Sequence, residues 1–405
     1  MPDPEDFFAR TGIRLADAES LDASAITTEI YNEWRAPRFG QQNPELMTNP
    51  LWDWLVRTGV NAYQAAQKFG GPSSYKAGPA WCFDRMGQSV TALPDGRCVF
   101  IAGEHEDYYD PDFYIYNDVV IWSPDGHIEI LGYPKDVFPP TDFHTATLLD
   151  DTIVIIGNLG YPEQRRLGIT QVVVLDVKTW SIKLVDTKGA APQWLHRHHA
   201  SWNGKSGVIE IIKGQIDPMT EGSRLRENLD RWELDPKGWQ WRKSWECRWP
   251  RREIHRHDGK RLDLWSMTNA LVPDPLAALD LDSIEALGLN ESIRDLLRQS
   301  SETHSAQRQQ MAARGFRLDM LESLHTPSIP HTPVDPEEDF GDEFPFKVKR
   351  IRVNNVIVRY MDEDSAIHMI VEGEIPDKIV DEIAEDLRAK LQIIQGVECR
   401  VSTPQ

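Results

Sequence analysis

An acidic stretch from residue 104 to residue 114, EHEDYYDPDFY, carries side chains that could bind a metal ion. Carboxylate oxygens suit calcium or magnesium, and a histidine among carboxylates suits iron or zinc. The spacing matches neither an EF-hand loop nor an HExxH helix, and loops of this kind also form metal-free binding surfaces. We therefore expect no cofactor, and we keep a divalent metal held by Glu104, His105 and Asp107 as the alternative.

A basic and aromatic stretch that starts at residue 239 is the second candidate. Between residues 242 and 261 there are eight Lys or Arg residues against three acids, with tryptophans among them. Such a stretch can bind single-stranded nucleic acid, but Trp and Arg also dominate protein interfaces. In this acidic chain we favour a protein partner over nucleic acid, with an intramolecular contact to the acidic run at residues 337–343 as a further option. The candidate partner-binding residues are Trp239, Trp241, Trp245, Arg248, Trp249, Arg251 and Arg252.

The histidines form a third group, at residue 144, residues 196–199 and residues 255–257. His144 and His198 stand at corresponding places in a repeat, which favours an architectural role. Several neutral imidazoles that converge on one channel could still bind a metal. The chain has no GxSxG, P-loop or Rossmann GxGxxG motif. We therefore do not expect an enzyme.

The elements that would position these residues come from a repeat. Its copies open at Gln88, His144 and His198, which are 56 and 54 residues apart. Each copy continues as a short strand, a tight polar turn, a β-branched strand and one glycine. A second hairpin follows, around a turn such as SPDG or DPKG. Four strands per copy make one blade of a β-propeller.

Over residues 80–265 the chain resembles the kelch-repeat proteins, and we identify it as a degenerate kelch-repeat protein of bacterial type. The resemblance implies a fold that is mainly β, with propeller or partial-propeller blades. The opening His or Gln generally packs between blades in this family. The matching residues are Gln88, His144 and His198, the glycines Gly103, Gly157 and Gly214, the triplet Tyr116-Asn117-Asp118, and the aromatics Trp180 and Trp239.

The chain departs from the kelch pattern in two ways. A kelch blade normally has two adjacent glycines, and the second position here holds Glu104, Asn158 or Gln215. The number of copies is also low, with only a partial fourth copy beginning at His255. Three and a fraction blades do not close a ring. Other segments complete a fourth blade, or the array stays open, or two chains combine.

Residues 1–79 are expected to form helices and loops that cover an end or edge of the β domain, because exposed strand edges need covering. Apolar residues recur at helical spacing from residue 51 to residue 66, and Gly70 follows as a stop. This pattern predicts one helix there.

The β domain is expected to span residues 80–272. A helical segment at 273–325 and a Pro-rich acidic linker at 326–345 follow it. Residues 346–405 predict a small α+β domain of order β-β-β-α-β, with a hairpin turn at Asn354-Asn355 and a helix between Pro376 and Gly396. We expect this domain to serve interaction or dimerisation, which makes a homodimer one outcome.

The composition indicates a cytoplasmic protein with no membrane partner. The formal net charge is −20, from 64 acids against 44 bases. No stretch approaches the roughly 18 consecutive apolar residues that a membrane helix needs, and the start shows no secretory signal. The scattered cysteines suit a reducing compartment.

Together these features predict a non-enzymatic protein-binding module. A bacterial immunity or antitoxin protein is one specific form of it, because an acidic protein can neutralise a basic toxin by charge complementarity. The alternative is a metal-dependent enzyme or a ligand-binding propeller that uses the acidic loop at residues 104–112.

Overall fold

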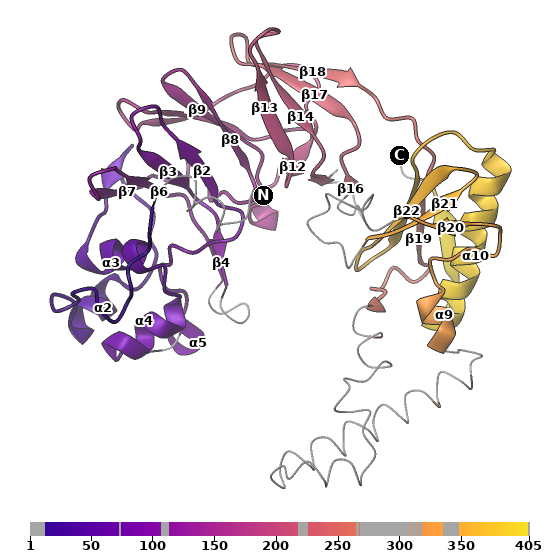
Figure 1. The fold of residues 1–405 in the computed structure, drawn as a ribbon, viewed down its shortest axis with the longest axis horizontal. Helices are drawn as coiled ribbons and strands as arrows, with labels where there is room; N and C mark the ends of the chain where they lie inside the picture. Colours follow the sequence, from indigo (N-terminus) through magenta and orange to yellow (C-terminus); the bar gives the residue numbers. More distant parts are fainter. Residues whose placement is uncertain are drawn as a thin grey trace, which may run out of the picture. The chain divides into compact units, whose positions relative to one another are not determined.

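The computed structural model describes residues 13–72, 74–106, 113–217, 226–264, 318–334 and 348–403, together with positions 267, 309 and 313. The fold is mainly β, as the sequence predicts, with several antiparallel sheets and few helices (Figure 1). Two compact units divide the chain, residues 1–247 and residues 248–405. Among the helices in the described ranges, none has the length and apolar character needed to span a bilayer.

The first unit contains three larger antiparallel sheets, of four or five strands each, that follow one another along the chain. We call them the first, second and third blades. The first blade has the order β1-β7-β6-β3-β2, from β1 (Glu45–Leu46), β2 (Ser89–Ala92), β3 (Cys98–Ile101), β6 (Val119–Trp122) and β7 (Ile128–Gly132). The second has the order β11-β10-β9-β8, from β8 (Thr145–Leu149), β9 (Thr152–Ile156), β10 (Val172–Asp176) and β11 (Ile182–Leu184). The third has the order β13-β14-β17-β18, from β13 (His199–Asn203), β14 (Val208–Ile212), β17 (Arg231–Asp235) and β18 (Gln240–Trp245).

The predicted hairpins are confirmed in all three blades. Gly96 and Gly126 close the two hairpins of the first blade with φ of +87° and +84°, as their PDG motifs require. Two smaller sheets extend the blades. They contain β4 (Glu104–His105) with β5 (Tyr114–Ile115), and β12 (Trp194–His196) with β15 (Gln215–Asp217) and β16 (Arg226–Glu227).

Apolar cores between the blades hold the array together. The second blade is buried on both faces, because Ile153 and Ile155 pack toward the first blade while Val154 and Ile156 pack toward the third. An apolar run of this kind is typical of a strand covered on both sides.

The array is open within the described residues, which show three blades and no closed ring. The outer face of the third blade is largely polar. Glu233 forms an ion pair with Arg242 on it, and Ile212 is an exposed apolar residue there. A polar outer face is what the terminal unit of a repeat array needs. Of the arrangements that the repeat count allows, the described residues show an open array.

Helices cover the opposite end of the array, on the outer face of the first blade (Figure 1). They are α2 (Thr28–Trp34), α3 (Pro50–Thr58), α4 (Ala62–Phe69) and the short α5 (Ser74–Ala77). The predicted cover is confirmed, but the single helix predicted across residues 51–66 is wrong. Gly59 ends α3 in the left-handed conformation, and Asn61 starts α4 with a capping box.

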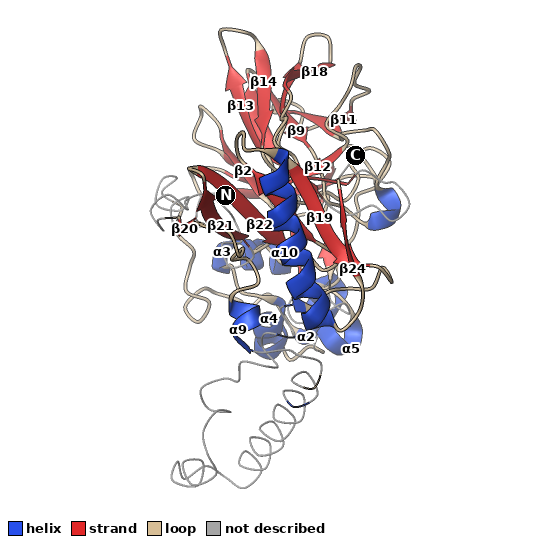
Figure 2. Cartoon of the chain, turned by 90° about the vertical axis from the view of Figure 1, so that its right-hand side faces the viewer, coloured by secondary structure: helices blue, strands red, loops and turns tan. Residues whose placement is uncertain are grey.

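The second unit is a six-stranded sheet of order β20-β21-β22-β23-β19-β24, with the long helix α10 (Asp377–Gln395) against one face (Figure 2). Its strands are β19 (Arg251–Arg256), β20 (Thr332–Pro333), β21 (Val348–Val353), β22 (Val356–Asp362), β23 (Ile367–Val371) and β24 (Cys399–Ser402), and α9 (Leu318–Glu322) precedes β20. Within the predicted domain at residues 346–405 the elements follow the order β21-β22-β23-α10-β24. The sheet also contains β19 and β20 from outside these bounds, and the unit begins at residue 248, inside the β domain expected at residues 80–272. The hairpin turn at Asn354 and Asn355 and the helix end at Gly396 are confirmed, all with left-handed φ.

The segment assigned to a partial fourth repeat belongs to this second sheet. Strand β19 lies between β23 and β24 and pairs antiparallel with both, so the copy expected from His255 is not a blade. Part of the expected linker, Thr332–Pro333, is strand β20 and pairs with β21. The helical prediction for residues 273–325 lies outside the described residues, apart from α9, and so does the linker from residue 335 onward.

Candidate functional site

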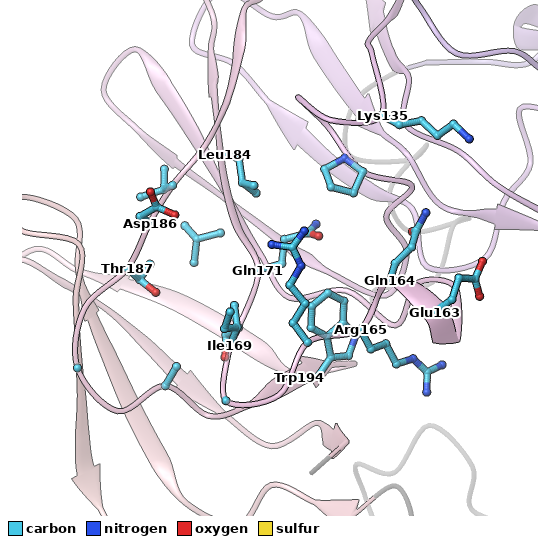
Figure 3. A pocket seen from close by; sticks show the side chains of 18 residues that line it. Lys135, Glu163, Gln164, Arg165, Ile169, Gln171, Leu184, Asp186, Thr187 and Trp194 are labelled. Carbon is cyan, nitrogen blue, oxygen red and sulfur yellow. The ribbon is translucent and has the colours of Figure 1, made fainter. Parts of the chain in front are cut away.

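A groove of about 430 Å³ lies beside the second blade and is the candidate binding site (Figure 3). Its walls are the end of β11 with the segment that follows it, the loop between β9 and β10, and the connection from β7 to β8. Apolar side chains, among them Ile169, Leu184 and Trp194, share the lining with charged ones such as Lys135, Glu163 and Asp186.

The wall formed by the loop between β9 and β10 is fixed by Arg165. Its guanidinium forms an ion pair with Asp217 at 3.0 Å and donates to the carbonyl oxygen of Leu159, also at 3.0 Å. Trp194 donates its indole N–H to the same carbonyl at 3.0 Å. These bonds tie the loop to the third blade's small sheet, so the wall is preformed.

Two large apolar side chains of the lining, Ile169 and Leu184, are partly exposed, and Leu167 is exposed on the same loop as Ile169. Leu167 is 65% exposed, Ile169 45% and Leu184 37%. Single exposed apolar residues are ordinary, but a gathering of them beside a groove is typical of an interaction surface.

The acidic loop leads to a different feature, a buried carboxyl pair. Glu104 is 8% exposed and Asp142 is fully buried. Burial raises the pKa of Glu104 to about 8, with the charge and hydrogen bond of Asp142 adding to this and Arg197 opposing it. Burial also raises the pKa of Asp142, although the backbone N–H of Gly160 donates to its Oδ1 at 2.6 Å. Burial of the two carboxyls therefore favours the protonated form of Glu104 beside Asp142.

Arg197 stands beside this pair because of a repeated backbone feature. Gly87, Phe143 and Arg197 each precede the residue that opens a repeat, and each is left-handed, with φ of +64°, +48° and +55°. Phe143 donates its N–H to the Gly87 carbonyl, and Arg197 donates its N–H to the Phe143 carbonyl. The Arg197 guanidinium stacks 3.5 Å from the centroid of the Phe143 ring. These backbone bonds place the Arg197 cation where it lowers the pKa of Glu104, against the effect of burial.

The repeat-opening histidines join the blades, as the sequence predicts. His144 shares a hydrogen bond with Ser89 in β2 at 2.7 Å, and His198 shares one with Thr145 in β8 at 2.8 Å. Burial lowers the pKa of each histidine to about 3, so both are neutral. The repeat glycine makes room for this contact, because a Cβ at Gly157 would lie 2.7 Å from the His198 ring.

The predicted metal ligands are not brought together. Glu104 and His105 are neighbours on β4, so their side chains leave opposite faces. His105 contacts the carbonyl of Asp84 at 2.9 Å, and Asp107 lies outside the described residues. No group of three His, Cys, Asp or Glu side chains suited to a metal ion occurs in the described part of the chain.

The basic and aromatic stretch does not lie on one element. Trp241 is 3% exposed and belongs to the core between the second and third blades, so it is not a surface contact. Trp239 packs against the same core, whereas Trp245 is 43% exposed. The remaining predicted contacts, Arg248, Trp249, Arg251 and Arg252, belong to the second unit, where Arg252 forms an ion pair with Asp381 of α10 at 2.7 Å.

Sequence reasoning missed Asp142, Arg165 and Arg197. A signal for Asp142 exists, because Asp142 and His196 both stand two places before a repeat-opening histidine and both are buried. Extending the repeat alignment upstream would have marked this position. The groove has no comparable signal, since its residues come from three connections of unrelated sequence.

Comparisons with known proteins add little to this geometry. No protein-family model matches the sequence, and no curated protein matches it. Among solved structures, the chain is similar to YjhT, with 14% identity and a TM-score of 0.28. That match covers 42% of this chain and spans about half of YjhT, 52%. A likeness this low carries no argument about fold or function.

Proposed function

We propose that this chain is a non-enzymatic protein-binding module and that the groove beside the second blade is its binding surface. The observation that carries the proposal is the exposure of Ile169 and Leu184 in the lining of that groove, with Leu167 exposed on the loop that forms one of its walls. Burying exposed apolar area of this kind favours association by roughly 25 cal/mol per Å². The preformed walls add to this, because a partner would not have to order the loop.

A matched pair of substitutions tests the proposal. Ile169 in the groove and Ile212 on the third blade have similar exposure, 45% and 41%. We expect a stoichiometric protein to co-purify from native cells with the wild type and with Ile212→Glu, and to be lost with Ile169→Glu. Equal capture by both variants would contradict the groove as the binding surface.

Neutralisation of a toxin is one specific form of this function. The charge of −20 favours a basic partner through electrostatic complementarity. Toxin neutralisation predicts that the co-purifying protein is basic and that its activity is suppressed in the complex. An acidic partner would argue against it.

A second candidate is a ligand-binding propeller centred on the acidic loop. The observation that favours it is the buried pair of carboxyls, Glu104 and Asp142, with Arg197 nearby, because a carboxyl whose pKa is raised by burial can both donate and accept hydrogen bonds. Elemental analysis of the purified protein tests its metal-dependent version. A stoichiometric divalent metal that is lost on Glu104→Gln would support it, and folded protein free of metal would count against it.

A further inference from the structure

The outer strand of the second blade ends in an open edge. Strand β11 is the terminal strand of its sheet, paired only with β10. Val185 donates its N–H to the Val172 carbonyl at 2.9 Å, so this pair is hydrogen-bonded. Bonded and non-bonded pairs alternate along an antiparallel ladder. The next pair, Leu184 with Val173, is therefore non-bonded, and the N–H and C=O of Leu184 point away from β10.

The same alternation turns the backbone of Ile182 outward, and there the chain supplies a partner. Ile182 donates its N–H to Oδ1 of Asn43 at 2.8 Å, and Nδ2 of Asn43 donates to the Ile182 carbonyl at 2.8 Å. A single side-chain amide thus takes the place of a neighbouring strand. Leu184 is the next residue of β11 whose backbone points outward. The described residues provide no further strand beside it.

The equivalent edge of the first blade shows what a full cover looks like. Strand β1 pairs antiparallel with β7 and places Glu45 opposite Gly132. Met47 donates its N–H to the Ile130 carbonyl at 2.7 Å, and Ile130 donates its N–H to Oγ1 of Thr48 at 2.8 Å. Strand addition at an outer blade edge is therefore already part of this fold.

The open edge borders the groove. Leu184 belongs to the groove lining, and its side chain is 37% exposed. A strand laid along this edge would direct alternate side chains to one face. Side chains on the groove face would meet Ile169 and Trp194, so apolar residues fit there.

We propose that the outer edge of β11 at Leu184 is a strand-addition site for an extended segment of a protein partner that carries apolar side chains on its groove face. The inference rests on the proposed protein-binding function and specifies its mode. Main-chain hydrogen bonds to Leu184 would provide affinity, and the groove would select side chains, as in other cases of β-augmentation.

The test uses the full-length protein and a display library of random linear twelve-residue peptides. Selected peptides are measured against wild type, Leu184→Pro, Leu184→Ala and Ile212→Ala. Proline removes the outward N–H while the ladder bonds of the neighbouring residues stay, and an edge strand tolerates it there. We expect Leu184→Pro to weaken binding at least tenfold, Leu184→Ala to weaken it less, and Ile212→Ala to leave it unchanged.

Amide hydrogen exchange on the wild type keeps the test independent of how well Leu184→Pro folds. Binding should slow exchange at Leu184 at least tenfold. Peptides that bind equally well to Leu184→Pro, or that protect amides elsewhere, would overturn the edge site while leaving the protein-binding function standing. A library without any binder would count against both. A dimer of the free protein that Leu184→Pro dissolves would assign the edge to a second copy and overturn the proposal.

Discussion

The outer edges of the first and second blades have the same architecture but differ in how much of each edge is covered. The first edge is completed by the chain's own strand β1 and lies at the end covered by helices. Among the residues that the structure describes, the second is covered only at Ile182, by the side chain of Asn43. Unpaired strand edges promote association, so proteins normally cover them. This difference is the basis of our proposal that a partner strand pairs with the second edge.

The covered edge depends on close packing that the open one lacks. A Cβ at Gly40 would lie 2.3 Å from the carbonyl carbon of Gly132 in β7, so the strap that leads into β1 runs directly over the edge. The first blade thus gains stability from its cover, and the second retains an exposed groove. Four substitutions test this contrast.

Trp52→Ala should have the largest effect, because it removes the centre of the helical cover on the first blade. Trp52 is fully buried, stacks on Trp81 with ring centroids 4.8 Å apart, and donates its indole N–H to the Trp34 carbonyl. We expect a loss of about 3–5 kcal/mol in the free energy of unfolding, measured with urea. Trp245→Ala, at a residue that is 43% exposed, should cost about 0.5 kcal/mol or less. Equal losses would refute the cover as a source of stability.

Gly40→Ala should make the first edge resemble the second. The added methyl group meets backbone atoms of β7, so β1 must shift, at a cost of about 1–3 kcal/mol. Exchange of the Ile130 amide should accelerate, since its acceptor is Oγ1 of Thr48. Gly238→Ala is the control, because its Cβ would have no neighbour closer than 3.7 Å. An unchanged Ile130 amide would contradict the account.

Glu104→Gln tests the contact between the first and second blades through the pH dependence of the free energy of unfolding. The fold raises the pKa of Glu104 to about 8, so its stabilising effect is complete below the ordinary value of 4.5 and is lost as pH rises through 8. Wild type should therefore lose roughly 2–3 kcal/mol between pH 6 and pH 9, a loss that Glu104→Gln avoids. Urea unfolding at both values measures it, with the exposed Glu163→Gln as control. Parallel pH profiles would show that the fold does not raise the pKa of Glu104.

Asn43→Ala should have the smallest effect on stability. It removes both side-chain bonds to Ile182, at a cost of about 1 kcal/mol. Asn43→Asp keeps an acceptor for the Ile182 N–H and loses the donor, so the Ile182 amide should stay protected only in that variant. Protection of this amide in Asn43→Ala would mean that another group covers the edge.

Local patterns made much of the fold predictable. The hairpins rest on turn residues such as Gly96 and Gly126, and helix α10 rests on an apolar stripe between Pro376 and Gly396. The break between α3 and α4 also has a local cause, the left-handed Gly59, which the prediction passed over.

Long-range pairing was out of reach of the sequence. Strand β19 pairs with strands more than one hundred residues away, and β1 pairs with β7. The sequence of neither segment contains a pattern that indicates which strand it pairs with. The candidate site is harder still, because an open edge is defined by the strand that is missing beside Leu184. The role of His144 and His198 between the blades could be predicted, because a position that recurs in the copies of a repeat usually has an architectural role.

The central claim is that the edge at Leu184 is open in the free protein and is closed by a partner. Amide hydrogen exchange at Leu184, with and without bound peptide, tests it most directly. The account predicts fast exchange in the free protein, while the Ile130 amide of the covered edge exchanges slowly, and slow exchange at Leu184 once the peptide binds. A Leu184 amide already as protected as Ile130, or one that binding leaves unchanged, would contradict it.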